Sequence, residues 1–188
     1  MSGTPTDMAK ISELTSIKVV AGSVVLRGDL TLPPNTSSLV LFAHGSGSSR
    51  LSPRNRFVAR ILNDSGVGTL LFDLLTERED AADQADGHLR FDIPLLRDRL
   101  VGATDWVMKQ AETKNLKIGY FGASTGAGAA LQAAAVRVNV VKAVVSRGGR
   151  PDLAGPSLPL VKAPTLLIVG ERDVDVLDMN RTAKSALG

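Results

Sequence analysis

Residues 117–137 read KIGYFGASTGAGAALQAAAVR, and this stretch decides the fold. Its first five residues form an apolar run typical of a buried strand, and residues 126–137 are small and compatible with a helix. The chain must therefore turn sharply from strand to helix. Gly122 and Gly126 lie two positions before and after Ser124, where bulkier residues would clash in so tight a turn. The stretch predicts a strand–turn–helix unit of an α/β protein.

Working outward from this unit, apolar runs alternate with helical patterns along the chain. The predicted strands are 38–43, 67–75, 117–121, 141–146 and 164–169. The predicted helices are 54–63, 91–111, 126–137 and 176–187. Residues 17–32 read as a hairpin split at 21–23, and 76–90 and 147–163 read as loops. This alternation predicts a mostly parallel sheet with helices on both faces, whose working site lies at the carboxyl ends of the strands.

Composition places the chain among ordinary globular proteins. It has 188 residues, 44% hydrophobic and 22% charged, which predicts a single domain over 1–188 with a flexible N-terminal segment at 1–16. There is no cysteine, which excludes disulfides and thiolate metal sites. The net charge of +3 comes without a basic-aromatic module, so we expect no nucleic-acid partner. The polar N-terminus and the lack of a long apolar stretch predict a soluble cytoplasmic protein without a membrane partner.

The central turn reads Gly122-Ala123-Ser124-Thr125-Gly126, a G-x-S-x-G pattern between a strand and a helix. Such a turn exposes the serine hydroxyl at the edge of the sheet. The helix that follows directs unpaired N–H groups and the positive end of its dipole at the same point. Ser124 is therefore the candidate nucleophile.

The loop His44-Gly45-Ser46-Gly47-Ser48-Ser49 follows another buried strand. A glycine-rich loop at this place lets backbone N–H groups approach a developing oxyanion. We expect one donor from Ser46 and a second from Thr125, with Gly45 bordering the substrate. The alternative for the loop taken alone is a simple Gly/Ser turn.

Charged residues follow the last two predicted strands. Asp173, at the end of Gly170-Glu171-Arg172-Asp173, is the candidate catalytic acid, and Asp175 is the second choice. The alternative for Asp173 is an exposed turn carboxylate. Arg147 and Arg150 are candidates for holding an anionic group of a substrate, because the guanidinium fork matches a carboxylate. The alternative is that both arginines shape their loop by bonding carbonyl oxygens.

Taken together, these motifs resemble the dienelactone-hydrolase-like branch of the α/β-hydrolase superfamily over about residues 17–187. The resemblance lies in AHGSGSSRLSPRN, LLFDLL, FDIPLL, GYFGASTGAGAA, SRGGRPDLAG and APTLLIVGERD. It implies an α/β-hydrolase-like three-layer sandwich, with Ser124 as nucleophile, Asp173 as acid, Ser46 and Thr125 as oxyanion donors, and His44 as a support of its loop. It also implies hydrolysis of a small-molecule ester, lactone or thioester through an acyl-serine, without a cofactor or metal.

The sequence departs from this family at the catalytic base. The family places its histidine after an eighth strand, beyond the acid, whereas this chain has only His44 and His88, both before Ser124. We therefore expect a sheet that lacks the last strand, with His88 as the one candidate base; its alternative is a surface histidine. A non-catalytic or C-terminally truncated scaffold is the alternative function.

Two further expectations follow from the same elements. Gly122, Gly126 and Gly128 also fit a dinucleotide-binding pattern, so a dinucleotide-dependent oxidoreductase is a remote alternative. That pattern usually follows the first strand, and the single tyrosine, Tyr120, precedes the loop rather than lying in a Tyr-x-x-x-Lys pair. An unpaired edge at strand 164–169 invites pairing, so we expect a homo-oligomer through this edge.

Overall fold

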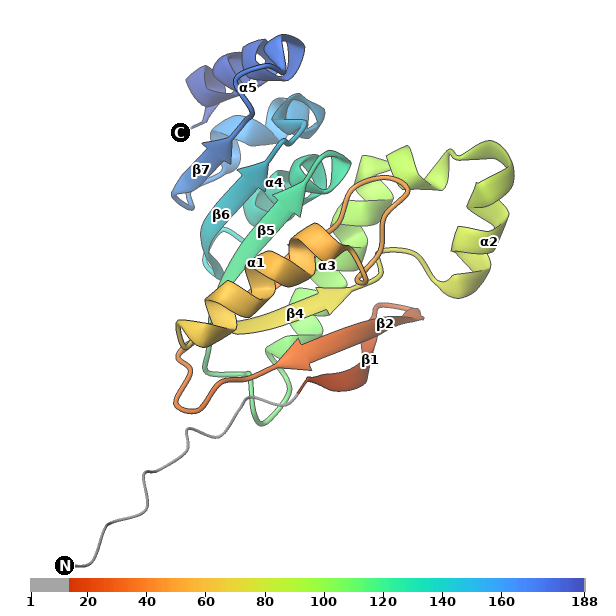
Figure 1. The fold of residues 1–188 in the computed structure, drawn as a ribbon, viewed down its shortest axis with the longest axis vertical. Coiled ribbons are helices and arrows are strands. Elements are labelled where there is room, and N and C mark those ends of the chain that lie inside the picture. The colour runs from red at the N-terminus through yellow and green to blue at the C-terminus, as the bar shows by residue number, and fades with distance from the viewer. Residues whose placement is uncertain (1–13, 188) are drawn as a thin grey trace, which may run out of the picture.

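The computed structural model describes residues 14–187, and its strands form one seven-stranded mixed sheet (Figure 1). The order is β1-β2-β4-β3-β5-β6-β7. β1 pairs with β2 and β2 with β4 in antiparallel fashion, and the other pairs are parallel. The strands are β1 (Thr15–Ala21), β2 (Val24–Thr31), β3 (Ser38–Ala43), β4 (Gly68–Phe72), β5 (Lys117–Ala123), β6 (Val141–Arg147) and β7 (Thr165–Ile168).

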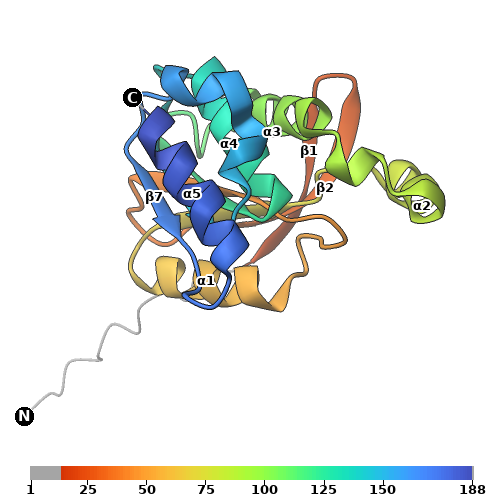
Figure 2. The same ribbon diagram turned by 90° about the horizontal axis from the view of Figure 1, so that it is seen from above.

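Helices cover both faces of this sheet, as the sequence predicts. Seen from above, α1 lies on one side of the strands, and α3 and α4 lie on the other (Figure 2). α5 packs against η2. The helical segments are α1 (Pro53–Asp64), α2 (Glu77–Asp86), η1 (Leu89–Phe91), α3 (Ile93–Val107), α4 (Thr125–Val136), η2 (Pro151–Leu160) and α5 (Val174–Ala186). The result is a three-layer α/β sandwich.

The larger core lies between the sheet and the α3–α4 layer. It includes Leu41, Leu70, Leu100 and Leu131, all fully buried. A smaller cluster of Phe42, Ala59, Leu71 and Phe121 lies under α1. All five residues of β4 are buried, because an inner strand of such a sheet is covered on both faces, which explains its continuous apolar sequence.

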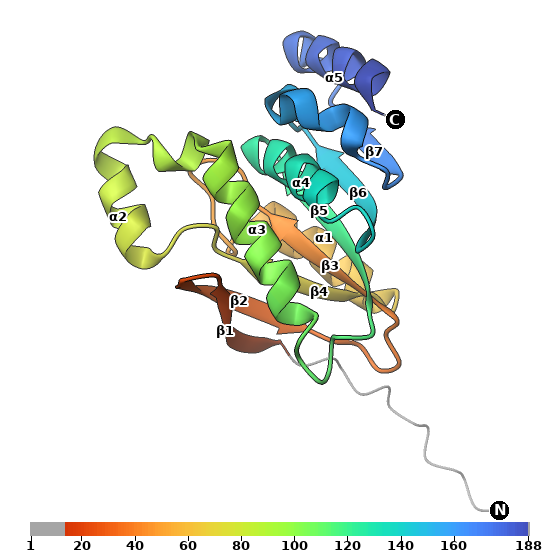
Figure 3. The ribbon, with the colours of Figure 1, turned by 180° about the vertical axis from the view of Figure 1, so that it is seen from behind.

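Two predicted loops are wrong in part. The segment 76–90 contains α2, which projects from the body of the molecule (Figures 1 and 3), and η1. The helix begins with a capping box, in which the Thr76 side chain accepts from Glu79 N–H and the Glu79 side chain accepts from Thr76 N–H. Its sequence has no apolar stripe, so hydrophobic periodicity did not reveal it. The segment 147–163 contains η2, whose prolines and glycines favoured a loop prediction.

The N-terminal boundary also needs a correction. Thr15 and Ser16 belong to β1, paired with Leu30 and Asp29, so the segment expected to be flexible does not extend to residue 16. The rest of that prediction, residues 1–13, lies outside the described residues. The predicted hairpin itself is confirmed, with Gly22 at φ 63° in its turn. Within residues 14–187, no helix has the combined length and apolarity needed to cross a membrane.

β7 lies at one edge of the sheet and pairs with β6 among the described residues. Leu166 and Ile168 on β7 are 56% and 45% exposed, which is unusual for apolar residues of a parallel strand. An interface between copies of the chain at this edge stays a prediction.

The close contact between α3 and β1 requires a glycine, Gly102, at the point where the two elements meet. A Cβ at Gly102 of α3 would lie 2.8 Å from the Cα of Ala21 in β1. We expect Gly102→Ala to lower the free energy of unfolding by about 1–3 kcal/mol, because overpacking against backbone outweighs the better helix propensity of alanine, about 1 kcal/mol. Urea unfolding measures this. Gly119→Ala is the control, since its Cβ would meet its nearest atom at an ordinary 3.5 Å. Equal stability of Gly102→Ala and the wild type would contradict the tight contact.

Candidate active site

Ser124 lies at the turn between β5 and α4, at the carboxyl end of a central strand. Its backbone has φ 52° and ψ −125°, one of two positive-φ non-glycine residues in the described chain. Such a conformation costs on the order of 1–3 kcal/mol and persists only where the surroundings enforce it. A strained serine at a strand-to-helix turn is the geometry expected from the G-x-S-x-G motif.

The two flanking glycines enforce this conformation by allowing close backbone contacts. A Cβ at Gly122 would lie 2.4 Å from the Cα of Ala127, and a Cβ at Gly126 would lie 2.2 Å from the carbonyl oxygen of Ala43. No side chain fits at either position. The turn is thus packed against both the helix it opens and the end of β3.

The loop after β3 passes directly beside the serine. A Cβ at Gly45 would lie 2.9 Å from the Cβ of Ser124 and 3.6 Å from its Oγ, so a larger residue would obstruct the hydroxyl. Ser46 N–H donates to Thr125 Oγ1 at 2.9 Å, which joins the loop to the first residue of α4. This bond occupies the Ser46 N–H, so the structure does not leave that group free to act as the oxyanion donor expected from the sequence. The amide of Thr125 is at the start of the helix and has no intrahelical acceptor, so it remains suited to an anion.

His44 holds the base of this loop. Its Nδ1–H donates to Gly45 O at 3.0 Å, and its Nε2 accepts from Leu74 N–H at 3.1 Å. Burial lowers the pKa of this imidazole, although the bond to Gly45 and the charges of Asp73 and Asp80 oppose the change. Neutral His44 therefore links the loop after β3 to the loop after β4, as a support rather than a reactive group.

The two candidate acids lie at the start of α5. Asp173 caps this helix and Asp175 is in its first turn, and both side chains are exposed. Within residues 14–187, the carboxylate of Asp173 makes no hydrogen bond to either histidine; its backbone N–H donates to Gly170 O at 3.1 Å. The structure thus places Asp173 at the expected strand end without joining it to a base.

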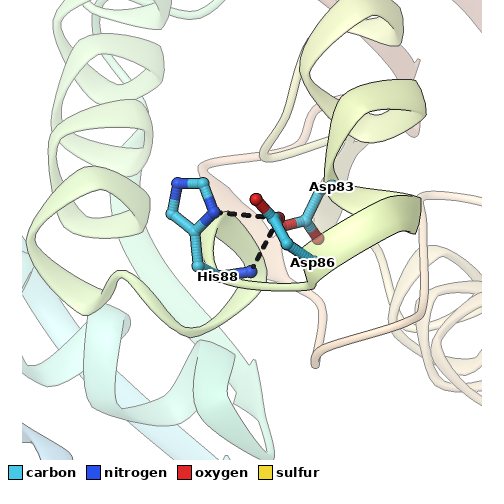
Figure 4. Close-up of side chains that lie close together, drawn as sticks. All are labelled: Asp83, Asp86 and His88. Carbon is cyan, nitrogen blue, oxygen red and sulfur yellow. Dashed lines mark hydrogen bonds and ion pairs between the residues drawn. The ribbon is translucent and has the colours of Figure 1, made fainter.

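His88 lies between α2 and η1, with a mostly exposed ring (Figure 4). Its Nδ1 is 2.9 Å from a carboxylate oxygen of Asp86, and this bond lowers the pKa of Asp86. An imidazole oriented by a carboxylate is the arrangement of a general base. In the described residues, however, neither His88 nor His44 has a hydrogen bond to Ser124.

Asp83, Asp86 and His88 lie close enough together to share a metal ion (Figure 4). The carboxylate of buried Asp83 is already used, however. It accepts from the N–H groups of Leu89 and Arg90 and from the Arg90 guanidinium. Burial would raise the pKa of Asp83, but these bonds lower it below its usual value. The cluster is explained by the closure of the turn between α2 and η1.

Arg147, the last residue of β6, and Arg150, in the loop that follows, differ in their roles. The Arg150 guanidinium pairs with Asp152 at 2.7 Å. The backbone N–H of Arg150 donates to Ser124 O at 3.1 Å, so Arg150 fixes the loop that follows β6 against the Ser124 turn. Arg147 donates to Asn55 Oδ1 at 2.9 Å and lies over the ring of Phe121 at 5.7 Å. Burial and neighbouring Arg54 lower its pKa. Among residues 14–187, Arg147 has no carboxylate partner.

A cavity of about 630 Å³ opens beside the loop that follows β3. It is lined by residues 45–53 of that loop and its end, by the residues that follow β4, and by α2. Arg27, Arg90 and Leu96 complete the lining. Ser124 does not line it, but Gly45, which borders Ser124, does. The α2 wall was missed from the sequence; the Thr76–Glu79 capping box was the signal that could have located it.

Comparisons with known proteins agree with this architecture. No family model matches the chain. Two Mycobacterium tuberculosis proteins, provisionally named phosphoribosyl transferases, are 58% identical over 172 residues, which is 91% of this chain but 38% of theirs. The chain thus spans well under half the length of these relatives.

Solved structures give a more complete match. A crystal structure of a dienelactone hydrolase from Anabaena variabilis is 58% identical, covers 94% of this chain and 82% of that chain, and superposes with a TM-score of 0.92. An esterase of Pyrococcus furiosus, 19% identical with a TM-score of 0.71 over 99% of this chain and 82% of that chain, shares the fold. With that Anabaena relative matched over most of both sequences, this chain belongs to the same family, within the α/β-hydrolase superfamily.

Proposed function

We propose that the chain is a serine hydrolase that forms an acyl-serine on Ser124 from an ester, lactone or thioester. The observation that carries this proposal is the strained Ser124 backbone at the β5–α4 turn, held by Gly122 and Gly126. Strain maintained at a nucleophilic residue is typical of an active site. The name of the Anabaena relative, a dienelactone hydrolase, supports the same class.

The proposed reaction is acyl transfer in two steps. Ser124 Oγ attacks the carbonyl carbon and loses its proton, and the C–O or C–S bond breaks as the leaving group takes up a proton to become an alcohol or thiol. Water then hydrolyses the acyl-serine, which yields the acid and restores the Ser124 hydroxyl. The oxyanion forms near the Thr125 N–H at the start of α4, where the helix dipole favours negative charge. Preorganised donors of this kind accelerate acyl transfer by about 10²–10³-fold each.

The proposed mechanism does not yet identify a base that takes the proton from Ser124 Oγ. Both histidines have other partners, Gly45 and Leu74 for His44 and Asp86 for His88. A hydrolase that lacks one triad member keeps roughly 10³–10⁴-fold catalysis over water. We therefore propose that this chain reacts with activated acyl groups, and the alternative remains a non-catalytic scaffold of the same fold. The Mycobacterium tuberculosis relatives are named phosphoribosyl transferases, but this chain covers 38% of their length. Nothing in the Ser124 site favours phosphoribosyl transfer.

Labelling with a fluorophosphonate tests the nucleophile. We expect one covalent adduct by intact mass, located on Ser124, because the strained turn holds Oγ next to backbone donors. Ser124→Ala should remove the adduct. Thr125 carries the one other hydroxyl between Gly122 and Gly126, so Thr125→Val is the second control and should retain the adduct. A wild-type protein that stays unmodified would favour the scaffold.

A substitution of His88 tests the candidate base. Because its ring is exposed and bonded to Asp86, we expect His88→Gln to change the rate of labelling by less than about twofold, well below the usual contribution of a general base. The rate is measured by mass spectrometry over time at a fixed, mildly alkaline pH. A loss on the order of 10²-fold, the lower end of general-base contributions, would instead identify His88 as the base.

The neutral state of His44 predicts a dependence on pH. Its pKa is lowered in the folded state, so the unfolded chain takes up a proton first as the pH falls. Stability should therefore decline below about pH 6.5, by at most about 1.4 kcal/mol per pH unit. Protonation would also place an Nε2–H against Leu74 N–H. Urea unfolding from about pH 8 to about pH 5 measures the slope, and His44→Gln should flatten it. An equal slope in both proteins would contradict the assignment.

A further inference from the structure

We propose, on the basis of the acyl transfer proposed for Ser124, that the cavity beside Gly45 binds a cationic group of the substrate through Asp80. The cavity and the nucleophile share one wall. Gly45 lines the cavity, and a Cβ there would lie 3.6 Å from Ser124 Oγ. Because Gly45 borders both, we place the group attached to a carbonyl at Ser124 in this cavity of about 630 Å³.

The charges that line the cavity are nearly, but not fully, balanced. Its three arginines are each paired: Arg27 with Glu77, Arg50 with Asp73, and Arg90 with Asp83. The fourth carboxylate of the lining, Asp80, belongs to an exposed residue and has no ion pair among the described residues. The cavity thus carries one negative charge that no cation of its own wall offsets.

The wall that carries Asp80 is fixed in place. Ion pairs join α2 to β2 through Arg27–Glu77, to α3 through Arg99–Glu79, and to η1 through Arg90–Asp83. Residues 77, 80 and 84 are spaced to lie on one face of the helix, and all three line the cavity.

This lining favours a cation over an apolar chain. Burial lowers the pKa of His44, and the charge of Asp80 is the smallest of the influences that oppose this change. A cation near Asp80 would gain a Coulomb attraction worth roughly five- to tenfold in affinity at partly solvated distances. An apolar chain in the same place would displace water from Asp80 and the ion pairs without replacing its hydrogen bonds.

The test uses a pair of probes that differ in charge alone. Choline and 3,3-dimethylbutan-1-ol have the same shape, with a quaternary nitrogen in one and a quaternary carbon in the other. NMR titration of the Ser124→Ala protein should show choline binding roughly five- to tenfold tighter than the alcohol. Asp80→Asn should abolish this preference, and Asp80→Lys should reverse it. Asp98→Asn, which removes a surface carboxylate of α3 outside the cavity, should leave it intact.

The corresponding thioesters separate this inference from the function on which it rests. Butyrylthiocholine should acylate the wild type faster than its uncharged isostere, with the same dependence on Asp80. Selective choline binding without acylation of Ser124 would refute the hydrolase and retain the cation site. Acylation without a preference for the cation would refute the site and retain the hydrolase. Equal or undetectable binding of choline and the alcohol, or a preference that survives Asp80→Asn, would overturn the inference.

Discussion

The carbonyl end of β3 packs against the backbone of α4 at Gly126, and the rest of the site depends on this contact. A single added carbon at Gly126 would lie 2.2 Å from the Ala43 carbonyl oxygen. Because the two segments approach so closely, the loop that follows Ala43 must pass beside Ser124. Ser124, two residues before Gly126, has a positive φ of 52° in the same turn. The packing of the central strands and the backbone geometry of Ser124 therefore meet at one place.

Polar interactions then fix what packing brings together. His44 joins its own loop to Leu74, Thr125 Oγ1 receives the Ser46 amide, and the Arg150 amide reaches the Ser124 carbonyl. Each bond links a strand end to a neighbouring loop along the carboxyl edge of the sheet. These bonds satisfy donors and acceptors at the strand ends, in addition to apolar contacts such as those of buried Leu74.

Away from Ser124, the helix α2 is held to the rest of the protein mainly by ion pairs rather than by apolar packing. α2 buries one residue, Asp83, and is attached to the body by arginine–carboxylate pairs. A helix held in this way contributes little to the core, so its sequence is free to set the polarity of the adjoining cavity. The shared fold positions Ser124 at the β5–α4 turn, whereas the charges of α2 set the polarity of the cavity wall in this chain.

The sequence by itself determined the layer order of this protein and the position of Ser124. Continuous apolar strands, small-residue helices and the glycines at 122 and 126 each leave a local pattern, because they reflect burial and steric limits that act within a few residues. Tertiary structure alone decided how the charged residues are used. Arg150 and Arg147 look alike in sequence, yet one is paired with Asp152 and the other lies on Phe121 without a carboxylate among the described residues. α2 and its ion pairs also left little local pattern, because partners far apart in the chain determine which charges are compensated.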